Sequence, residues 1–296
     1  MNDTSAQDGD SGRLPAWLRV KVGKADLVGP TSHLLGRHCV ATVCEQAHCP
    51  NIGECYGRGT ATFLIMGTVC TRNCRFCAVA TGEPAPLDPE EPERVAAAVA
   101  EMSLDFAVVT SVTRDDLPTG GAEHFAATLR ALHRRRPQAG VEVLTPDFHG
   151  DPGAVAAVLD AAPTVFNHNV ETVRRLQAEV RPQASYEWSL AVLAAAHRLA
   201  PEVPVKSGLI VGLGETAAEI RATMADLAAA GVSLLTIGQY LQPTRRHRPV
   251  SRYVPPDEFA LYEQWGLRAG LRHVVAGPFV RSSYCAAEAA RAVMAK

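Results

Sequence analysis

The chain has 296 residues, of which 47% are apolar, and its formal net charge is −2. This length and apolar content suffice for one large domain or two modest ones, and the near-neutral charge disfavours a nucleic-acid-binding protein. No stretch approaches the roughly 20 apolar residues of a membrane span, and the polar start lacks the apolar core of a secretory signal. We therefore expect a cytoplasmic protein whose residues 1–13 are disordered.

Residues 14–60 form an expected N-terminal extension that carries a cysteine triplet, Cys44, Cys49 and Cys55. Seven of the eight cysteines lie between residues 39 and 77, and such clustering of thiols favours a metal or iron–sulfur site over a disulfide framework. The alternatives for this triplet are a zinc site completed by His48 and buried, unliganded thiols. A second triplet follows closely, so an iron–sulfur cluster is the preferred interpretation.

The first expected strand covers residues 61–67, and a second triplet, Cys70, Cys74 and Cys77, follows at once. Thiolates suit iron–sulfur clusters and zinc. Three thiolates on a four-iron cluster leave one iron without a protein ligand, where a small molecule with an amine and a carboxylate can chelate. The spacing, with Phe76 before the last cysteine, is typical of radical S-adenosylmethionine (SAM) enzymes, and a zinc knuckle is the alternative.

After residue 80, apolar runs alternate with amphipathic, Ala-rich runs. The expected helices cover residues 91–102, 121–135, 152–162, 185–200, 217–229 and 256–270, and the expected strands 106–112, 141–146, 164–170, 204–213, 234–241 and 273–280. Thr216 and Glu219 predict a capping box for the fifth of these helices. Continuous apolar strands indicate a parallel sheet covered by helices on both faces. Six strand–helix units predict an α/β fold of the partial (β/α)6 TIM-like barrel type, and a flat doubly wound sheet is the alternative.

Polar residues follow most of these strands, and in a parallel barrel such positions form the catalytic face. The Cys70–Cys77 loop belongs to this face. Asn169, Glu171 and Lys206 also lie near strand ends. This distribution favours an enzyme over an inert scaffold.

Motifs spread over almost the whole chain resemble the lipoyl synthase family of radical SAM enzymes. They include TVCEQAHCPNIGECY, CTRNCRFCAV, TSVTRDDLPTGGAEHF, VFNHNVETV and GPFVRSSY, within a similarity that runs from about Leu14 to Cys285. The sequence departs from the family pattern at Thr68 and Thr113, where an acidic residue is common. It departs again at Arg174, where proline is usual, and at Gln183, where glycine is usual. None of these positions is a cluster ligand.

The resemblance implies two [4Fe-4S] clusters. Cys70, Cys74 and Cys77 would hold the first, whose open iron binds SAM. The second, auxiliary cluster would be held by Cys44, Cys49, Cys55 and the second serine of RSSY, which is Ser283. A serine oxygen is a poor and therefore labile ligand in a sulfur-rich site, and Cys285 remains a chemical alternative.

The resemblance also implies the reaction, which inserts two sulfur atoms at C6 and C8 of an octanoyl group bound to a lysine of a lipoyl carrier domain. No side chain can abstract hydrogen from such carbons, so a radical derived from a cofactor must do it. Two SAM molecules would be cleaved per turnover, and the auxiliary cluster would be the sulfur donor. The alternatives are a biotin-synthase-like enzyme, a ferredoxin-type electron carrier and a zinc-stabilised binding module.

The implied partners are octanoylated lipoyl domains of 2-oxoacid dehydrogenase complexes, the glycine cleavage H protein, a flavodoxin or ferredoxin-type reductant and an iron–sulfur carrier. Neither nucleic acid nor a membrane is expected. Arg245, Arg246 and Arg248 are candidates to meet an acidic carrier surface, with a solvated loop as the alternative.

Three residues are expected at the SAM site: Phe76 near the adenine, and Asn169 and Glu171 at the ribose. Asn169 has a second interpretation, in which Asn167 and Asn169 only tie down backbone at the strand end. His168 is expected to be a scaffold residue. The expected domains are the extension, a radical SAM barrel over residues 61–272, and a C-terminal segment, 273–296, that carries Ser283 and closes over the barrel mouth.

Overall fold

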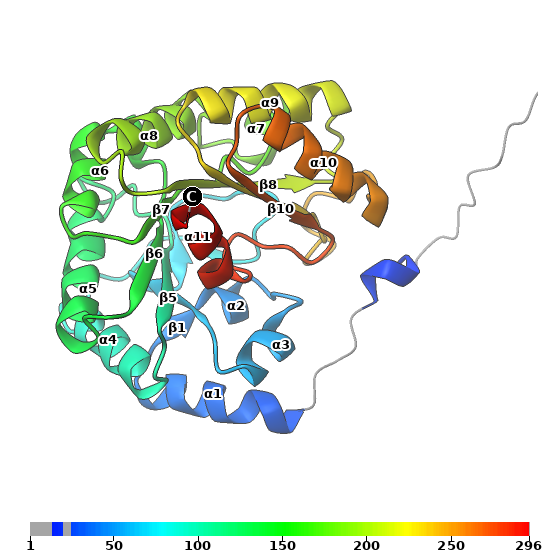
Figure 1. Ribbon diagram of the computed structural model, residues 1–296. Coiled ribbons are helices and arrows are strands. Elements are labelled where there is room, and N and C mark those ends of the chain that lie inside the picture. The colour runs from blue at the N-terminus through cyan, green and yellow to red at the C-terminus, as the bar shows by residue number, and fades with distance from the viewer. Residues whose placement is uncertain (1–13, 20–24, 296) are drawn as a thin grey trace, which may run out of the picture.

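The computed structural model describes residues 14–19 and 25–295, and it confirms the α/β class with a partial barrel (Figure 1). The strands of the main sheet are, in spatial order, β1 (Ala41–Thr42), β2 (Thr62–Ile65), β5 (Phe106–Ser111), β6 (Gly140–Leu144), β7 (Val165–Asn167), β8 (Val205–Val211), β9 (Leu234–Gln239) and β10 (His273–Gly277). All neighbours from β2 to β10 pair in parallel, and β1 pairs with β2 in the antiparallel direction. The spatial order follows the chain without reversal, so a doubly wound sheet is excluded.

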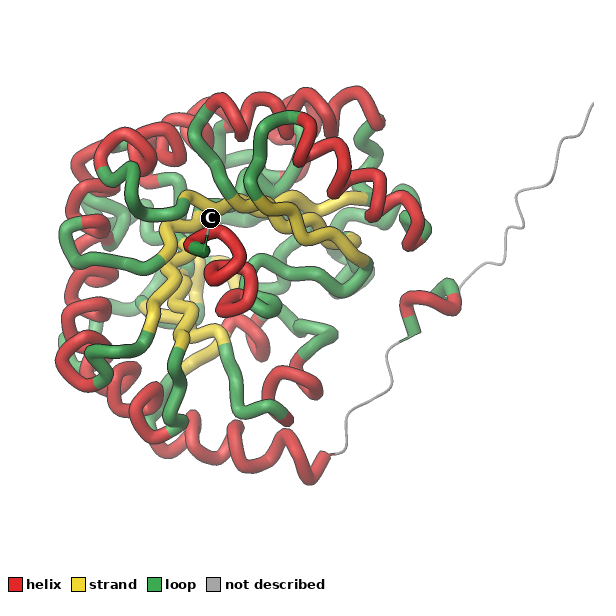
Figure 2. Tube along the Cα trace, viewed as in Figure 1, coloured by secondary structure: helices red, strands yellow, loops and turns green. Residues whose placement is uncertain are grey.

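Helices cover the outer face of the curved sheet, as Figures 1 and 2 show. Those that follow the strands are α4 (Glu91–Glu101), α5 (Ala122–Arg135), α6 (Pro152–Leu159), α8 (Tyr186–Leu199), α9 (Ala217–Ala229) and α10 (Pro256–Arg268). The capping box of α9 is present, because the Thr216 and Glu219 side chains bond each other's backbone N–H groups. The main core lies between strands and helices, where Phe63, Val109 and Val143 are buried. No described helix has the length and apolar character needed to cross a bilayer.

The sequence pattern missed the short elements. In the extension these are η1 (Ala16–Leu18), α1 (Ala25–Arg37), α2 (Val43–Gln46) and α3 (Ile52–Gly57). Beside the barrel mouth lie β3 (Val69–Cys70), β4 (Ala80–Thr81), η2 (Phe148–Gly150), η3 (Arg174–Leu176) and α7 (Gln177–Val180), and near the C-terminus lies α11 (Ala286–Met294). The shortest of these carry too few periods for a hydrophobic pattern to be recognised. The 13-residue α1 is long enough, but Gly29 and Pro30 inside it are residues that disfavour a helix interior. The expected disorder of residues 1–13 falls outside the described residues.

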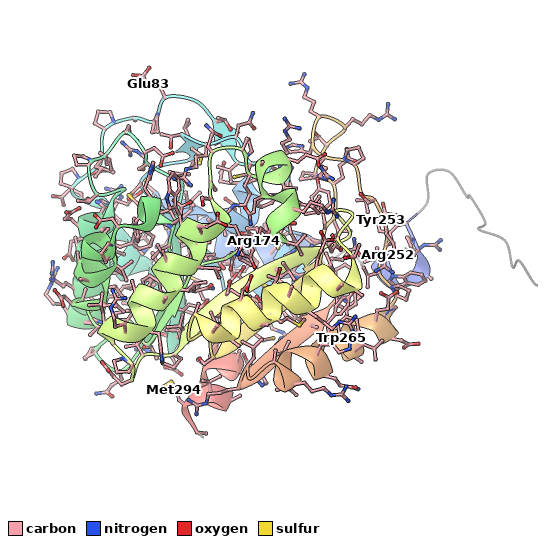
Figure 3. All side chains as sticks on the ribbon, turned by 90° about the horizontal axis from the view of Figure 1, so that it is seen from above. Glu83, Arg174, Arg252, Tyr253, Trp265 and Met294 are labelled. Carbon is pink, nitrogen blue, oxygen red and sulfur yellow. The ribbon has the colours of Figure 1, made fainter. Side chains whose placement is uncertain are left out.

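The C-terminal segment follows a different course from the one expected. After β10 it passes along the inner face of the barrel, where a Cβ on Gly238 would collide with the carbonyl oxygen of Val280. Arg272 Nη2 then donates a 3.0 Å bond to the Val293 carbonyl, so α11 lies at the amino ends of the strands. In Figure 3, Met294 of α11 lies at the opposite end of the molecule from Glu83, which follows the cysteine loop. The expectation that this segment closes over the barrel mouth is therefore wrong for α11. Gly238, which has no side chain, leaves room for the segment to run inside the barrel.

Candidate active site

The Cys70–Cys77 loop begins directly after β2, at the carboxyl end of the sheet. Cys70 Sγ accepts hydrogen bonds from the backbone N–H groups of Arg72, at 3.4 Å, and Thr113, at 3.3 Å. Burial, and then the nearby thiols of Cys74 and Cys70, raise the pKa of Cys77 to about 12. Burial also raises the pKa of Cys74, opposed by the charge of Arg181 and reinforced by Cys70. The three sulfurs therefore gather in one partly buried place.

Arg72 anchors this loop from inside through two carboxylates. Its guanidinium binds Asp115 at 2.7 and 2.8 Å and Asp147 at 2.6 and 2.8 Å. Both partners follow strands, Asp115 after β5 and Asp147 after β6, and Asp147 is fully buried. In the structure Asp115 holds the cysteine loop, whereas Arg114 pairs with Asp116 at 2.7 Å.

The other side of the loop is held by segments from the far side of the barrel mouth. Gln183 Oε1 accepts a 2.6 Å bond from the Asn73 N–H, and His247 Nε2 donates a 2.9 Å bond to the Cys77 carbonyl. The Arg248 N–H donates to the Arg75 carbonyl at 2.9 Å. Gln183 thus supports the loop at a position where the sequence departs from the family pattern. Nothing in the local sequence around Gln183 pointed to this contact.

Asn169 and Glu171 lie just past β7, on the same side as the cysteine loop. Asn169 Nδ2 donates to Glu171 Oε1 at 3.0 Å and to Ser282 Oγ at 2.6 Å, while its Oδ1 is buried without a hydrogen-bond partner among the described residues. Glu171 has a left-handed φ of 66°, and burial raises the pKa of its carboxyl. Its charge reaches Cys74 and Cys77. Phe76 packs against the main core.

His168 and Lys206 have structural partners inside the barrel. His168 Nδ1 donates to the Thr145 carbonyl at 2.9 Å, its Nε2 lies 2.9 Å from Ser189 Oγ, and burial lowers its pKa to about 4. It is therefore the neutral scaffold residue that was expected. Lys206 Nζ binds both carboxylate oxygens of Glu142, at 2.8 and 2.9 Å, and the two side chains are fully buried. Lys206 is thus held within the barrel by an ion pair.

The second triplet gathers in the extension beside the barrel interior. Burial raises the pKa of Cys55 to about 12, and the charges of Cys44 and Cys49 add to this rise. Burial also raises the pKa of Cys44, where hydrogen bonds with Thr62 oppose the rise and the charge of Cys49 adds to it. Thr62 Oγ1 donates a 2.8 Å bond to Ser283 Oγ. The structure therefore brings Ser283 to the triplet through Thr62, which lies 221 residues earlier in the sequence.

Further contacts fasten the C-terminal segment to the extension. Asn51 Nδ2 donates to the Phe279 carbonyl at 2.7 Å, and Tyr284 OH donates to Glu54 Oε1 at 3.1 Å. Cys285 also lies close enough for its charge to act on Cys55, so proximity alone does not choose between it and Ser283. Cys39 is exposed.

The two groups of thiols fit iron–sulfur clusters in ligand type. Each group holds three partly buried thiols whose negative charges would repel one another, and bound iron removes that repulsion. Among residues 14–19 and 25–295, no three His, Cys, Asp or Glu side chains surround a position for a single metal ion.

The arginines of the 245–248 loop differ in exposure, because Arg248 pairs with Glu179 and donates to the Leu213 carbonyl at 2.9 Å.

A cavity of about 770 Å³ lies between the cysteine loop and the 245–248 loop. Its lining includes Arg75, Cys77, Glu179 and Arg246. Arg246 is exposed at this cavity, and its neighbour Arg245 is also exposed. These two residues, rather than Arg248, are available to a protein partner.

Comparisons with known proteins agree with this geometry. Residues 64–227 match the Radical SAM superfamily. The chain is 55% identical to a protein named lipoyl synthase from Halorhodospira halophila, over 92% of this chain and 82% of that protein. It is 56% identical to another from Rubrobacter xylanophilus, over 93% of this chain and 85% of that protein. Among solved structures, methylornithine synthase has a similar fold, with a TM-score of 0.51 and 13% identity over 85% of this chain and 80% of that one.

Proposed function

Because this chain belongs to the lipoyl synthase family of the Radical SAM superfamily, we propose that it inserts two sulfur atoms at C6 and C8 of a carrier-bound octanoyl group. The observation that carries the proposal is the position of Ser283. Its hydroxyl lies 2.8 Å from Thr62 beside Cys44, so the chain supplies four candidate ligands at the second triplet and three at the first. A site with three ligands can bind SAM, and a site with four can hold a sulfur source.

The cofactors follow from these ligand sets. Cys70, Cys74 and Cys77 would hold one [4Fe-4S] cluster, and Cys44, Cys49, Cys55 and Ser283 the other. When bound, the first group supplies the electron that cleaves SAM to methionine and a 5′-deoxyadenosyl radical, twice per turnover, and the second supplies the inserted sulfur.

The residues past β7 are suited to position SAM. Asn169 Oδ1 is buried and lacks a partner among the described residues, so it can accept a hydrogen bond from a ribose hydroxyl. Its Nδ2 fixes the Glu171 carboxylate at 3.0 Å, and the left-handed backbone of Glu171 keeps that carboxylate near the cysteine loop. Such a backbone conformation is costly and persists where the surroundings enforce it. Phe76 would pack against the adenine.

Ser283 is suited to be a weak ligand. A hydroxyl oxygen is a hard donor among soft thiolates, and the Thr62 hydroxyl donates to the same oxygen. That hydrogen bond would weaken a bond from this oxygen to iron. The serine hydroxyl would also keep a hydrogen-bond partner if the cluster were dismantled.

The proposed partners are octanoylated lipoyl domains of 2-oxoacid dehydrogenase complexes and the glycine cleavage H protein. A flavodoxin or ferredoxin-type protein would deliver electrons, and an iron–sulfur carrier would rebuild the second cluster. Exposed Arg245 and Arg246 would meet the acidic surface of the carrier. All of these would be met in the cytoplasm.

Anaerobic turnover tests the function directly. The reconstituted protein is incubated with an octanoyl-lysine peptide, dithionite and SAM, and the peptide is analysed by mass spectrometry. We expect a product with two added sulfur atoms, and protein that carries about eight iron and eight sulfide, as two four-iron clusters require. Protein that binds zinc alone, or cleaves SAM without adding sulfur, would contradict the proposal.

A further inference from the structure

Arg281 lies in the C-terminal segment between residues that are each fixed by a partner. Phe279 is held by Asn51 at 2.7 Å, and on the other side Ser283 is held by Thr62 at 2.8 Å. Ser282 receives a 2.6 Å bond from Asn169. The backbone of Arg281 is therefore placed inside the barrel by its neighbours, whatever its own side chain binds.

The guanidinium of Arg281 forms no ion pair with any carboxylate of the described residues. Its Nη1 donates at 2.7 Å to the carbonyl of the preceding residue, Val280, and lies 3.1 Å from the position of a Cβ on Gly238. By contrast, Arg72 is saturated by two aspartates. A guanidinium has five N–H donors, and Arg281 is half-buried, so holding its charge there is unfavourable without an anion. The placement of Arg281 therefore calls for an anionic partner.

The contacts that fix this stretch come from the surroundings of the second triplet. Asn51, which holds Phe279, lies between Cys49 and Cys55 in the sequence, and Thr62, which holds Ser283, hydrogen-bonds with Cys44. Glu54, an acidic group beside this triplet, already pairs with Arg58 at 3.0 Å and accepts a bond from Tyr284. A four-iron cluster with three thiolates and one serine oxygen carries net negative charge, and it would lie within reach of Arg281.

We propose that Arg281 is the counter-cation of the second cluster. This inference rests on the proposed function, because it requires the second cluster. A fixed positive charge favours the more negative, reduced state of a nearby redox group. Arg281 should therefore make the second cluster easier to reduce, and so help it to accept the charge that develops when it gives up sulfur.

The test isolates the second cluster and measures its reduction potential. Cys70, Cys74 and Cys77 are all replaced by alanine, so that only the second cluster is reconstituted. Arg281→Gln and Arg281→Lys are made in this background, and potentials are followed by electron paramagnetic resonance during a redox titration. We expect Arg281→Gln to make reduction roughly tenfold less favourable, which is about 59 mV for one electron, and Arg281→Lys to stay close to the parent.

Arg272→Gln is the matched control. Arg272 belongs to the same end of the chain but donates to the Val293 carbonyl at the amino ends of the strands, away from the triplet. It should leave both iron content and potential unchanged. Circular dichroism and iron analysis accompany each variant. Loss of iron in Arg281→Gln, with retention in Arg281→Lys, also supports a role for the charge.

Two results would overturn the inference while leaving the proposed function in place. One is a potential in Arg281→Gln equal to that of the parent. The other is equal loss of iron in Arg281→Gln and Arg281→Lys, which would show that shape rather than charge matters. A background protein that binds no iron would instead remove the second cluster itself, and with it both proposals.

Discussion

The two cysteine triplets are built in opposite ways. Cys70, Cys74 and Cys77 share one loop, which barrel side chains such as Arg72 and Gln183 hold in place. The other triplet is spread over α2, α3 and the turn between them, and its fourth candidate ligand arrives from 221 residues beyond Thr62. The candidate ligands of the first site are therefore close together in the sequence. Those of the second site come together only when the chain folds.

The charges beside the two sites differ in the same way. Arg72 is fully paired with Asp115 and Asp147, so the first loop is anchored by the protein alone. Arg281 has no carboxylate partner among the described residues. We infer that the first site is organised before its cluster binds, whereas the second is completed by its cluster.

The largest expected effects come from removing each triplet in turn. Alanine at Cys70, Cys74 and Cys77 should abolish cleavage of SAM, because no iron is left to bind it. Alanine at Cys44, Cys49 and Cys55 should leave cleavage intact and abolish sulfur insertion. Chromatography of 5′-deoxyadenosine and mass spectrometry of the peptide separate the two. If both variants lost SAM cleavage equally, the division of roles would be wrong.

Breaking the anchor of the first loop should have the next largest effect. Arg72→Met leaves Asp147 buried without its partner, which should lower the free energy of unfolding by about 3–5 kcal/mol. Arg134→Gln, which removes an exposed pair with Glu93, should have a much smaller effect, because surface ion pairs are screened by solvent. Denaturant unfolding under anaerobic conditions measures both. Equal losses of unfolding free energy in the two variants would contradict a larger contribution from the buried ion pairs of Arg72.

Acid should act on the first site through His168. Its folded pKa of about 4 is below the ordinary 6.5, so the unfolded chain binds the proton more readily between these values. The free energy of unfolding should fall by up to ~3 kcal/mol as the pH is lowered from 6.5 to 4. His168→Gln should flatten this part of the profile, and His197→Gln, at an exposed position, should leave it unchanged. An unaltered profile in His168→Gln would contradict a buried, neutral histidine.

Replacing Ser283 by a stronger ligand should affect the second site alone. Ser283→Cys supplies a thiolate, so the second cluster should persist while sulfur insertion falls by roughly tenfold, a typical cost of altering a metal site. Single-turnover rates and iron analysis report the two effects. Full activity in this variant would mean that a labile oxygen is not required. Ser282→Cys, one residue away, tests whether position matters.

The exposed arginines should have the smallest effect. Replacing Arg245 and Arg246 by glutamate should raise KM for an octanoylated carrier domain several-fold at low salt, because it reverses a complementary charge. The same variant should use a short octanoyl-lysine peptide normally. An unchanged KM for the carrier would remove these residues from the docking surface. Arg198→Glu, on α8, is an exposed control.

Periodicity sufficed for the barrel, because apolar strands and amphipathic helices alternate there in repeated units. The spacing of Cys70, Cys74 and Cys77 likewise predicted a shared site, which the structure supports. Contacts between distant segments were beyond this method. Arg72, Gln183 and Arg281 carry no local pattern, and their roles arise only when loops from separate strands meet. The assignment of Ser283 as a ligand came from family resemblance. The expected domain boundaries of the chain remain predictions.

The passage of the C-terminal segment through the barrel has a consequence for the order of synthesis. Residues of the first site are all made, with most of the barrel around them, before Ser283 leaves the ribosome, and domains begin to fold as they emerge. Gly208 and Gly238 keep a path open for the last segment. A chain cut short before this segment could thus assemble a site that cleaves SAM while lacking the site that supplies sulfur. Loss of the last residues should therefore uncouple radical formation from sulfur insertion.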